Sequence, residues 1–124
     1  VRVFAAEPLG ADDAARSVAA GQLLPQDDPR TVADGLRTGL GSNTWPVVRD
    51  LVEAVLTVEE AEIVRCMRLI WERMKLVIEP SAAVGVAAAM GPIFRRIDGI
   101  ERVGVVLCGG NVDLDALPWV VSGS

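Results

Sequence analysis

The chain has 124 residues, a mass of 13.1 kDa and a formal net charge of −5, a length sufficient for one domain with a sizeable core. Hydrophobic residues make up 51% of it, which excludes an intrinsically disordered chain. The acidic balance, without a run of lysine or arginine, argues against a nucleic-acid surface. Because the sequence contains no histidine, histidine-based triads and histidine metal sites are excluded.

The first half predicts strands alternating with short helices. Residues 1–6 read as a strand that has already begun at the first residue, so we expect the chain to be a piece of a longer one. A turn at 7–10 precedes a helix over 12–20, which Gly21 ends. Pro46 suits the first turn of a short helix over 47–52, and a strand follows over 54–58.

The second half predicts two helices and a buried strand. The longest helix covers 59–77, and its apolar residues recur every three or four positions, at Ile63, Met67, Ile70, Met74 and Val77. An alanine-rich helix over 81–90 implies close packing, and the β-branched run 102–108 reads as a strand. The alternation predicts an α/β fold with a mostly parallel sheet and flanking helices, without a second domain.

The strand over 102–108 ends at Gly109-Gly110-Asn111, where open α/β sheets place ligands. Two glycines let the backbone approach a flat or anionic group, while Cys108 and Asn111 supply a thiol and an amide. The same residues also form ordinary turns. Cys66 and Cys108 lack Cys-x-x-Cys spacing and lie in a helix-like and a strand-like segment, so we expect no disulfide and a cytoplasmic protein.

Two groups of carboxylates are candidates for a functional role. Glu7 closes the first strand, and a Pro-x-Gly turn could fold Asp12 and Asp13 back towards it, a donor set that suits Mg²⁺ or Ca²⁺. In the alternative, Asp12 or Asp13 caps the helix and Glu7 is solvated. Glu79 stands between two helices at a partly buried junction and needs partners; Arg73, Lys75 or a helix N-terminus could supply them.

Five blocks of the sequence together resemble the C-terminal part of the serine racemases. These belong to the serine/threonine dehydratase group of pyridoxal-phosphate enzymes, which have the tryptophan-synthase-β fold (fold type II). The blocks keep the same order and a similar spacing, and they are Glu7–Asp13, Thr31–Leu36, Asn43–Asp50, Trp71–Pro80 and Cys108–Leu114. The resemblance implies that residues 1–124 form the C-terminal part of the large domain. The Schiff-base lysine, the phosphate loop and the serine base would then lie N-terminal to Val1, so no catalytic residue is expected in this chain.

The resemblance also assigns binding roles. Cys108 matches the position, usually serine, that faces the pyridine nitrogen of pyridoxal phosphate. Gly35 matches a backbone position beside the cofactor, and Glu79 one near the cofactor and its link to an effector. Because a thiol cannot protonate the ring as a carboxylic acid would, the ring would be a weaker electron sink.

Metal and nucleotide roles follow from the same resemblance. Glu7, the carbonyl of Ala11 and Asp13 match the family's Mg²⁺ or Ca²⁺ site, and Asn43 matches a second calcium contact. Lys75 and Asn111 match positions that touch an activating ATP.

The resemblance implies an enzyme that interconverts L- and D-serine through a Cα carbanion, with β-elimination to pyruvate and ammonia. The alternatives are a threonine/serine ammonia-lyase and a non-catalytic metal-binding or interaction fragment. Expected partners are serine, the missing N-terminal half and a second copy in a homodimer, without nucleic acid or membrane.

Overall fold

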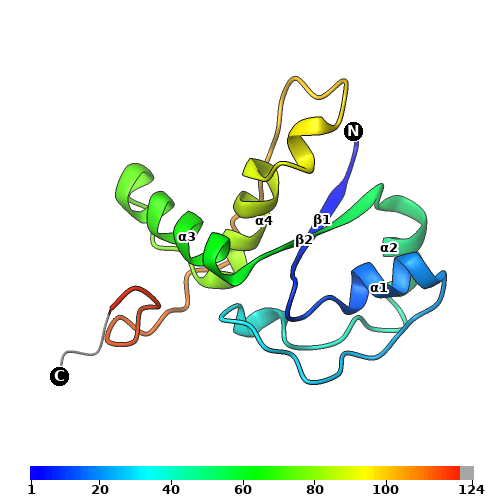
Figure 1. The fold of residues 1–124 in the computed structure, drawn as a ribbon, viewed down its shortest axis with the longest axis horizontal. Helices are drawn as coiled ribbons and strands as arrows, with labels where there is room; N and C mark the ends of the chain where they lie inside the picture. The colour runs from blue at the N-terminus through cyan, green and yellow to red at the C-terminus, as the bar shows by residue number, and fades with distance from the viewer. Residues whose placement is uncertain (121–124) are drawn as a thin grey trace.

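Two parallel strands lie between two pairs of helices in the computed structural model, which describes residues 1–120 (Figure 1). β1 (Phe4–Pro8) and β2 (Ala54–Val58) pair in parallel, with Phe4 opposite Ala54 and Pro8 opposite Val58. This confirms the predicted α/β class. The last four residues of the predicted unit 1–124 lie outside the described residues.

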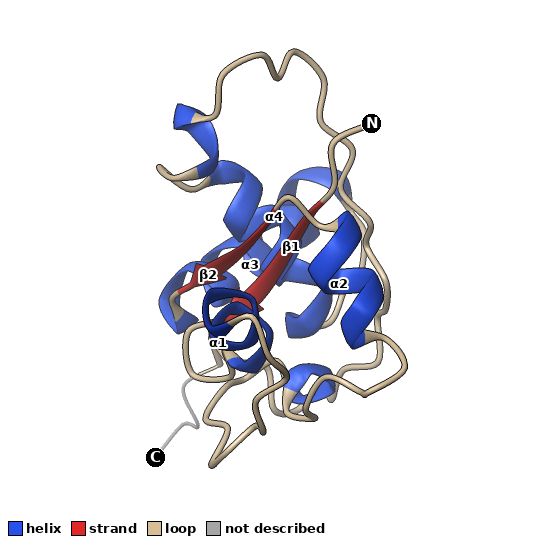
Figure 2. Cartoon of the chain, turned by 90° about the vertical axis from the view of Figure 1, so that its right-hand side faces the viewer, coloured by secondary structure: helices blue, strands red, loops and turns tan. Residues whose placement is uncertain are grey.

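Helices lie on both sides of the two strands. α1 (Asp13–Ala20) and α2 (Trp45–Leu51) lie on one side, and α3 (Glu60–Met74) and α4 (Pro80–Met90) on the other (Figures 1 and 2). α1 packs on β2 and α4 on both strands, while α2 packs on α1 and α3 on α4. Each falls within a few residues of its predicted range. Two short 3₁₀ helices, η1 (Asp34–Leu36) and η2 (Phe94–Arg96), complete the described elements.

The core is built mainly where α3 packs on α4. The predicted stripe on α3 contributes Ile63, Met67 and Ile70, which are buried together with Cys66. α4 is buried from Ser81 to Val84 and from Val86 to Ala88, and its small side chains allow the close packing that its alanine content predicted. Both strands contact α4, so this helix links the core to the sheet.

The longest helix ends earlier than predicted. Lys75 adopts a left-handed conformation with φ 58°, so α3 stops at Met74, and both Met74 and Val77 are exposed. The indole N–H of Trp71 donates to the carbonyl of Ile78 at 2.9 Å and holds the following turn against the helix. Periodicity cannot reveal this stop, because the apolar pattern continues past the residue that reverses the chain.

The predicted strand over 102–108 is wrong as a paired element. The segment runs back along α4 (Figure 1), is mostly exposed and joins no sheet in the described chain, where the sheet contains only β1 and β2. A β-branched run becomes a strand only when a neighbouring strand supplies hydrogen-bond partners. Here a groove separates the segment from β1.

Two other expectations concern membrane-spanning helices and the cysteines. No helix within residues 1–120 is both long and apolar enough to cross a membrane. Cys66 is buried and Cys108 exposed, and the two do not form a disulfide with each other.

Candidate functional site

The beginning of α4 is the point where three segments distant in sequence meet. Glu79, the residue before α4, donates its backbone N–H to the carbonyl of Gly109 at 3.1 Å. One carboxylate oxygen of Glu79, Oε2, accepts the backbone N–H of Asn111 at 2.9 Å. The glycine loop after Cys108 is therefore bound directly to the acidic residue that precedes α4.

Close approach requires glycine at position 110, where the neighbour is backbone, whereas at Gly109 the neighbour is the movable carboxylate of Glu79. A Cβ atom at Gly109 would lie 2.6 Å from Oε2 of Glu79, and one at Gly110 would lie 2.6 Å from the carbonyl oxygen of Val77. The sequence predicted that Gly-Gly approaches something flat or anionic, and one such group is the chain's own carboxylate.

The partners proposed for Glu79 on the helix side are wrong. Lys75 instead donates from Nζ to the carbonyl of Glu72 at 2.7 Å, at the end of α3. No described ion pair includes Glu79, and its side chain does not cap α4. The left-handed turn at Lys75 separates this lysine from the start of α4, so backbone N–H groups of the glycine loop take over.

Gly35 reaches the same place from η1. Its N–H donates to Oγ of Ser81 at 3.1 Å, and a Cβ at Gly35 would lie 2.9 Å from that oxygen and 3.7 Å from Oε1 of Glu79. Sequence reasoning missed Ser81. The available signal was a small hydroxyl residue directly after Glu79-Pro80, where a helix begins and side-chain oxygens find backbone donors.

A groove of about 780 Å³ runs from this cluster between β1 and the segment 99–106, with α4 as its floor. Its walls are largely apolar, and Leu36, Ser81 and Cys108 also line it. The structure thus brings together the three predicted cofactor residues, Gly35, Glu79 and Cys108, and adds Ser81. The thiol of Cys108 and the hydroxyl of Ser81 are neutral partners suited to a heteroaromatic ring. These residues fit pyridoxal phosphate.

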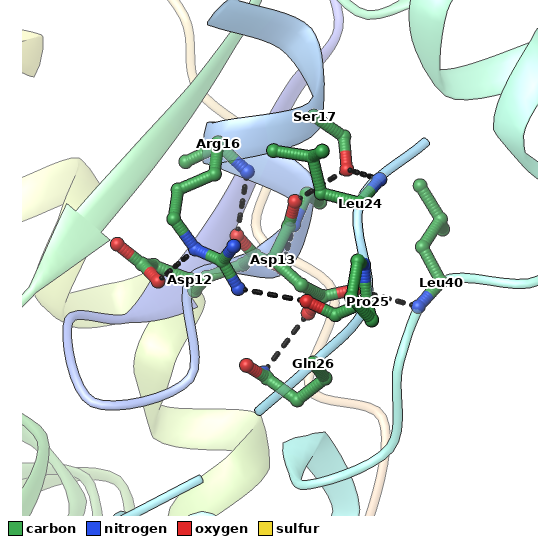
Figure 3. A network of polar contacts seen from close by, with 11 residues as sticks. Asp12, Asp13, Arg16, Ser17, Leu24, Pro25, Gln26 and Leu40 are labelled. Atoms are coloured by element: carbon green, nitrogen blue, oxygen red, sulfur yellow. Dashed lines mark hydrogen bonds and ion pairs between the residues drawn. The ribbon is translucent and has the colours of Figure 1, made fainter. Parts of the chain in front are cut away.

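The second candidate site contains Glu7 and Asp13. Glu7 accepts the backbone N–H of Ala14 at 3.2 Å and of Ala15 at 2.9 Å, one on each carboxylate oxygen. Asp13 accepts the side-chain amide of Gln26 at 3.0 Å and the N–H of Leu40 at 2.6 Å (Figure 3). Both carboxylates are therefore held by neutral donors.

The simple capping alternative is wrong in its details. Asp12 stands at the N-cap position of α1, but its side chain makes no capping bond and pairs with Arg16 at 2.9 Å. The cap comes from Glu7, because the turn after β1 directs this carboxylate onto the free N–H groups of the first turn. Glu7 is half-buried rather than solvated.

Glu7 and Asp13 line one cavity of about 240 Å³ with the loop 38–41 and Thr44. Burial raises the pKa of Glu7, the N–H groups of Ala15 and Ala14 oppose this, and the negative charge of Asp13 raises it further. Such repulsion is what a bound cation relieves.

The other two predicted metal ligands, Ala11 and Asn43, do not line the cavity of Glu7 and Asp13. Ala11, which lies between Glu7 and Asp13 in the sequence, is buried. Asn43 is exposed. Within residues 1–120, no group of three or more histidine, cysteine, aspartate or glutamate side chains is placed to hold a metal. A cation here would depend on two carboxylates, carbonyl oxygens and water.

Lys75 and Asn111, the predicted nucleotide contacts, lie on two segments that meet where Gly110 approaches Val77. Both residues are exposed. No hydrogen bond joins their side chains in the described structure, where Lys75 is bound to Glu72.

Comparison with known proteins identifies the family. Residues 1–109 match the sequence profile of the pyridoxal-phosphate dependent enzymes. The chain belongs to this family. The match includes both strands, all four α-helices and the cluster around Glu79 up to Gly109.

Individual members of the family are also similar. The chain is 51% identical to serine racemase of Bos taurus over 97% of its own length, which is 36% of that protein. The structure of maize serine racemase superposes with a TM-score of 0.90 at 46% identity, covering 93% of this chain and 36% of that one. The structure of the T.th. threonine deaminase gives a TM-score of 0.77 at 38% identity, covering 90% of this chain and 40% of that one. The chain thus spans about a third of the length of the curated relatives it matches.

Proposed function

We propose that these residues form the C-terminal part of the large domain of a pyridoxal-phosphate dependent serine racemase. The same enzyme would also convert serine to pyruvate and ammonia, by β-elimination of water followed by hydrolysis of the resulting imine, which takes up one water. The observation that carries this proposal is that Glu79 lies near Gly35 and contacts the glycine loop that follows Cys108. Cys108 and Ser81 line the groove beside these contacts. The proposal's support outside the structure is the 51% identity to a serine racemase.

Each residue of the cluster has a distinct task in this proposal. Pyridoxal phosphate, when bound, withdraws electrons from Cα of the amino acid so that its proton can be removed. The thiol of Cys108 would face the pyridine nitrogen and leave it without a full positive charge. Gly35 would leave room beside the ring, and Glu79 would hold the loop that carries Cys108. None of these residues removes the proton, so the acid and base belong to the rest of the enzyme.

The groove supports a further part of the proposal, the missing N-terminal half. β1 has one edge without a strand partner in the described chain, and the extended segment 99–106 faces it across the groove. Neighbouring strands lie about 4.8 Å apart, so strands from the remainder of the enzyme can enter the groove and pair with both sides. The 102–108 segment would then become the strand that its sequence predicts.

Several finer properties belong to the same proposal. A Mg²⁺ or Ca²⁺ ion would be bound by Glu7, Ala11 and Asp13, with Asn43 as a second calcium contact. ATP would contact Lys75 and Asn111 as an activator. We also propose a cytoplasmic homodimer; cell fractionation and light scattering of the complete enzyme test these two assignments.

The test uses the complete enzyme that contains these residues. Borohydride reduction followed by mass measurement should find the cofactor fixed to the polypeptide. After incubation with L-serine, chiral chromatography should detect D-serine, and a coupled assay should detect pyruvate.

A threonine/serine ammonia-lyase is the second candidate, favoured by the similarity to threonine deaminase. Pyruvate without any D-serine, or 2-oxobutyrate formed faster from threonine than pyruvate from serine, would decide for it. An enzyme that carries no cofactor after reconstitution would leave only the third candidate, a non-catalytic metal-binding or interaction fragment.

A further inference from the structure

Ser81 is placed at the centre of the cofactor cluster without having been assigned a role there. It is the second residue of α4 and 9% exposed. Its Oγ accepts the N–H of Gly35 at 3.1 Å, which places the side chain between η1 and α4; the same N–H also donates to Oδ1 of Asp34 at 2.9 Å. A hydroxyl that accepts one hydrogen bond still has a proton to donate. Among residues 1–120, no acceptor of the chain takes that proton.

The place towards which this proton can be donated is the groove. Ser81 and Cys108 both line it, and Glu79 connects them, because its carboxylate contacts Gly109 and lies near Gly35. A thiol is a weak hydrogen-bond donor and a hydroxyl a stronger one. Of these two groove-lining residues, Ser81 therefore offers the stronger neutral donor.

We propose that the hydroxyl of Ser81 is an additional cofactor-binding group, which donates a hydrogen bond to pyridoxal phosphate beside Cys108. The inference rests on the proposed function, since it needs the cofactor at this end of the groove. It explains how a chain with cysteine at position 108 keeps a firm polar contact to a neutral ring. Ser81 then has two functions, to hold the backbone of Gly35 and to hold the cofactor.

The experiment measures cofactor binding by the complete enzyme, without relying on turnover. Ser81→Ala should raise the Kd of pyridoxal phosphate about three- to tenfold, as expected for one lost hydrogen bond. The gap in Tm between the cofactor-loaded and cofactor-free forms should shrink, and the absorbance band of the bound cofactor should shift. Cys108→Ser introduced into Ser81→Ala should recover part of the affinity, because it supplies a hydroxyl to the same wall.

A matched control separates this role from simple packing. Ser17, in α1, is also a buried serine and does not line the groove. Its hydroxyl donates to the carbonyl of Asp13 and accepts the N–H of Leu24. Ser17→Ala should lower the Tm of both forms equally and leave the Kd unchanged. If Ser81→Ala does not fold, Ser81→Thr and Ser81→Val replace it, since they share a shape and differ in the hydroxyl; only Val should lose affinity.

Two failures are distinguishable. A wild-type enzyme that takes up no pyridoxal phosphate contradicts the proposed function itself. A wild-type enzyme that binds it, with Ser81→Ala or Ser81→Val within twofold of the wild-type Kd, overturns only the inference. Ser81 would then serve solely to anchor Gly35.

Discussion

Backbone N–H groups hold the two candidate glutamates, Glu7 and Glu79, in position. Glu7 and Glu79 are both half-buried carboxylates, and both accept backbone N–H groups rather than lysine or arginine. Backbone donors do not move, so these two side chains are held in fixed positions at the end of β1 and the start of α4. A carboxylate held in this way is suited to orient a loop or to bind a cation without rearranging.

Glu7→Gln tests the cation at the residue scale. The amide oxygen still accepts an N–H from the first turn of α1, so the fold should persist. The rise in Tm that Mg²⁺ or Ca²⁺ gives the complete enzyme should disappear, because one charged ligand is lost. Glu62→Gln, on the exposed surface of α3, is the control and should keep the full metal effect. An unchanged metal-dependent rise in Glu7→Gln would show that the site is elsewhere.

Gly110→Ala tests the steric requirement of the glycine loop. Its Cβ would meet a backbone oxygen at 2.6 Å, so the loop must move away from Val77. We expect a loss of about 1–3 kcal/mol in the free energy of unfolding, measured with urea. Gly104→Ala is the control, since nothing lies within 4 Å of its Cβ. Equal stability of the two variants would contradict the close approach.

Cys66 gives a pH dependence with a defined sign. Burial between α3 and α4 raises the pKa of its thiol. The unfolded thiol, with a pKa of about 8.5, therefore loses its proton at lower pH than the folded one. Above that pH the folded state binds more protons, and its stability falls as pH rises. Urea midpoints between pH 7 and 10 should show a shallower decline in Cys66→Ala than in Cys108→Ala; parallel declines would refute this.

At the scale of elements, α4 connects every part of the candidate site. Its N-terminus carries Glu79 and Ser81, its small residues pack against α3, and its other face forms the floor of the groove. Displacing α4 would therefore disturb the core and the cofactor cluster together. The packing of α3 on α4 sets where Ser81 and Glu79 lie.

Met67→Ala tests this packing. Met67 is fully buried against α4, and its truncation should lower the free energy of unfolding by about 2–5 kcal/mol. Met74, on the same helix, is 54% exposed, so Met74→Ala should change stability by less than about 0.5 kcal/mol. Thermal unfolding of the purified variants measures both. A small effect at Met67 would mean that α3 is not anchored through this residue.

Most of the helices and strands could be predicted from the sequence. Periodicity and turn residues located β2 and, within a few residues, all four α-helices, because these signals are local. The end of α3 at Lys75 could not be predicted, since a left-handed lysine has no sequence signature as glycine does. The partners of Glu79 and Ser81 are 32 and 46 residues away along the chain, beyond the reach of local patterns.

For the molecule as a whole, the described residues contain two paired strands beside an apolar groove. Glu79 lies near Gly35 and contacts the glycine loop after Cys108, near this groove. The sequence of 102–108 predicted a strand because it has the composition of one. Pairing requires a neighbouring strand, which in our proposal comes from the rest of the enzyme and enters the groove.

The measurement that tests the central claim most directly is the protection of Cys108 in the complete enzyme. Iodoacetamide labelling, followed by mass analysis of peptides, compares the form freed of pyridoxal phosphate with the loaded form. We predict that Cys108 reacts in the free form, where the empty cofactor site leaves its thiol open to the reagent, and is protected after loading. Cys66, buried in the core, should stay unlabelled in both forms. Labelling of Cys108 at the same rate in both forms would contradict a cofactor at this wall.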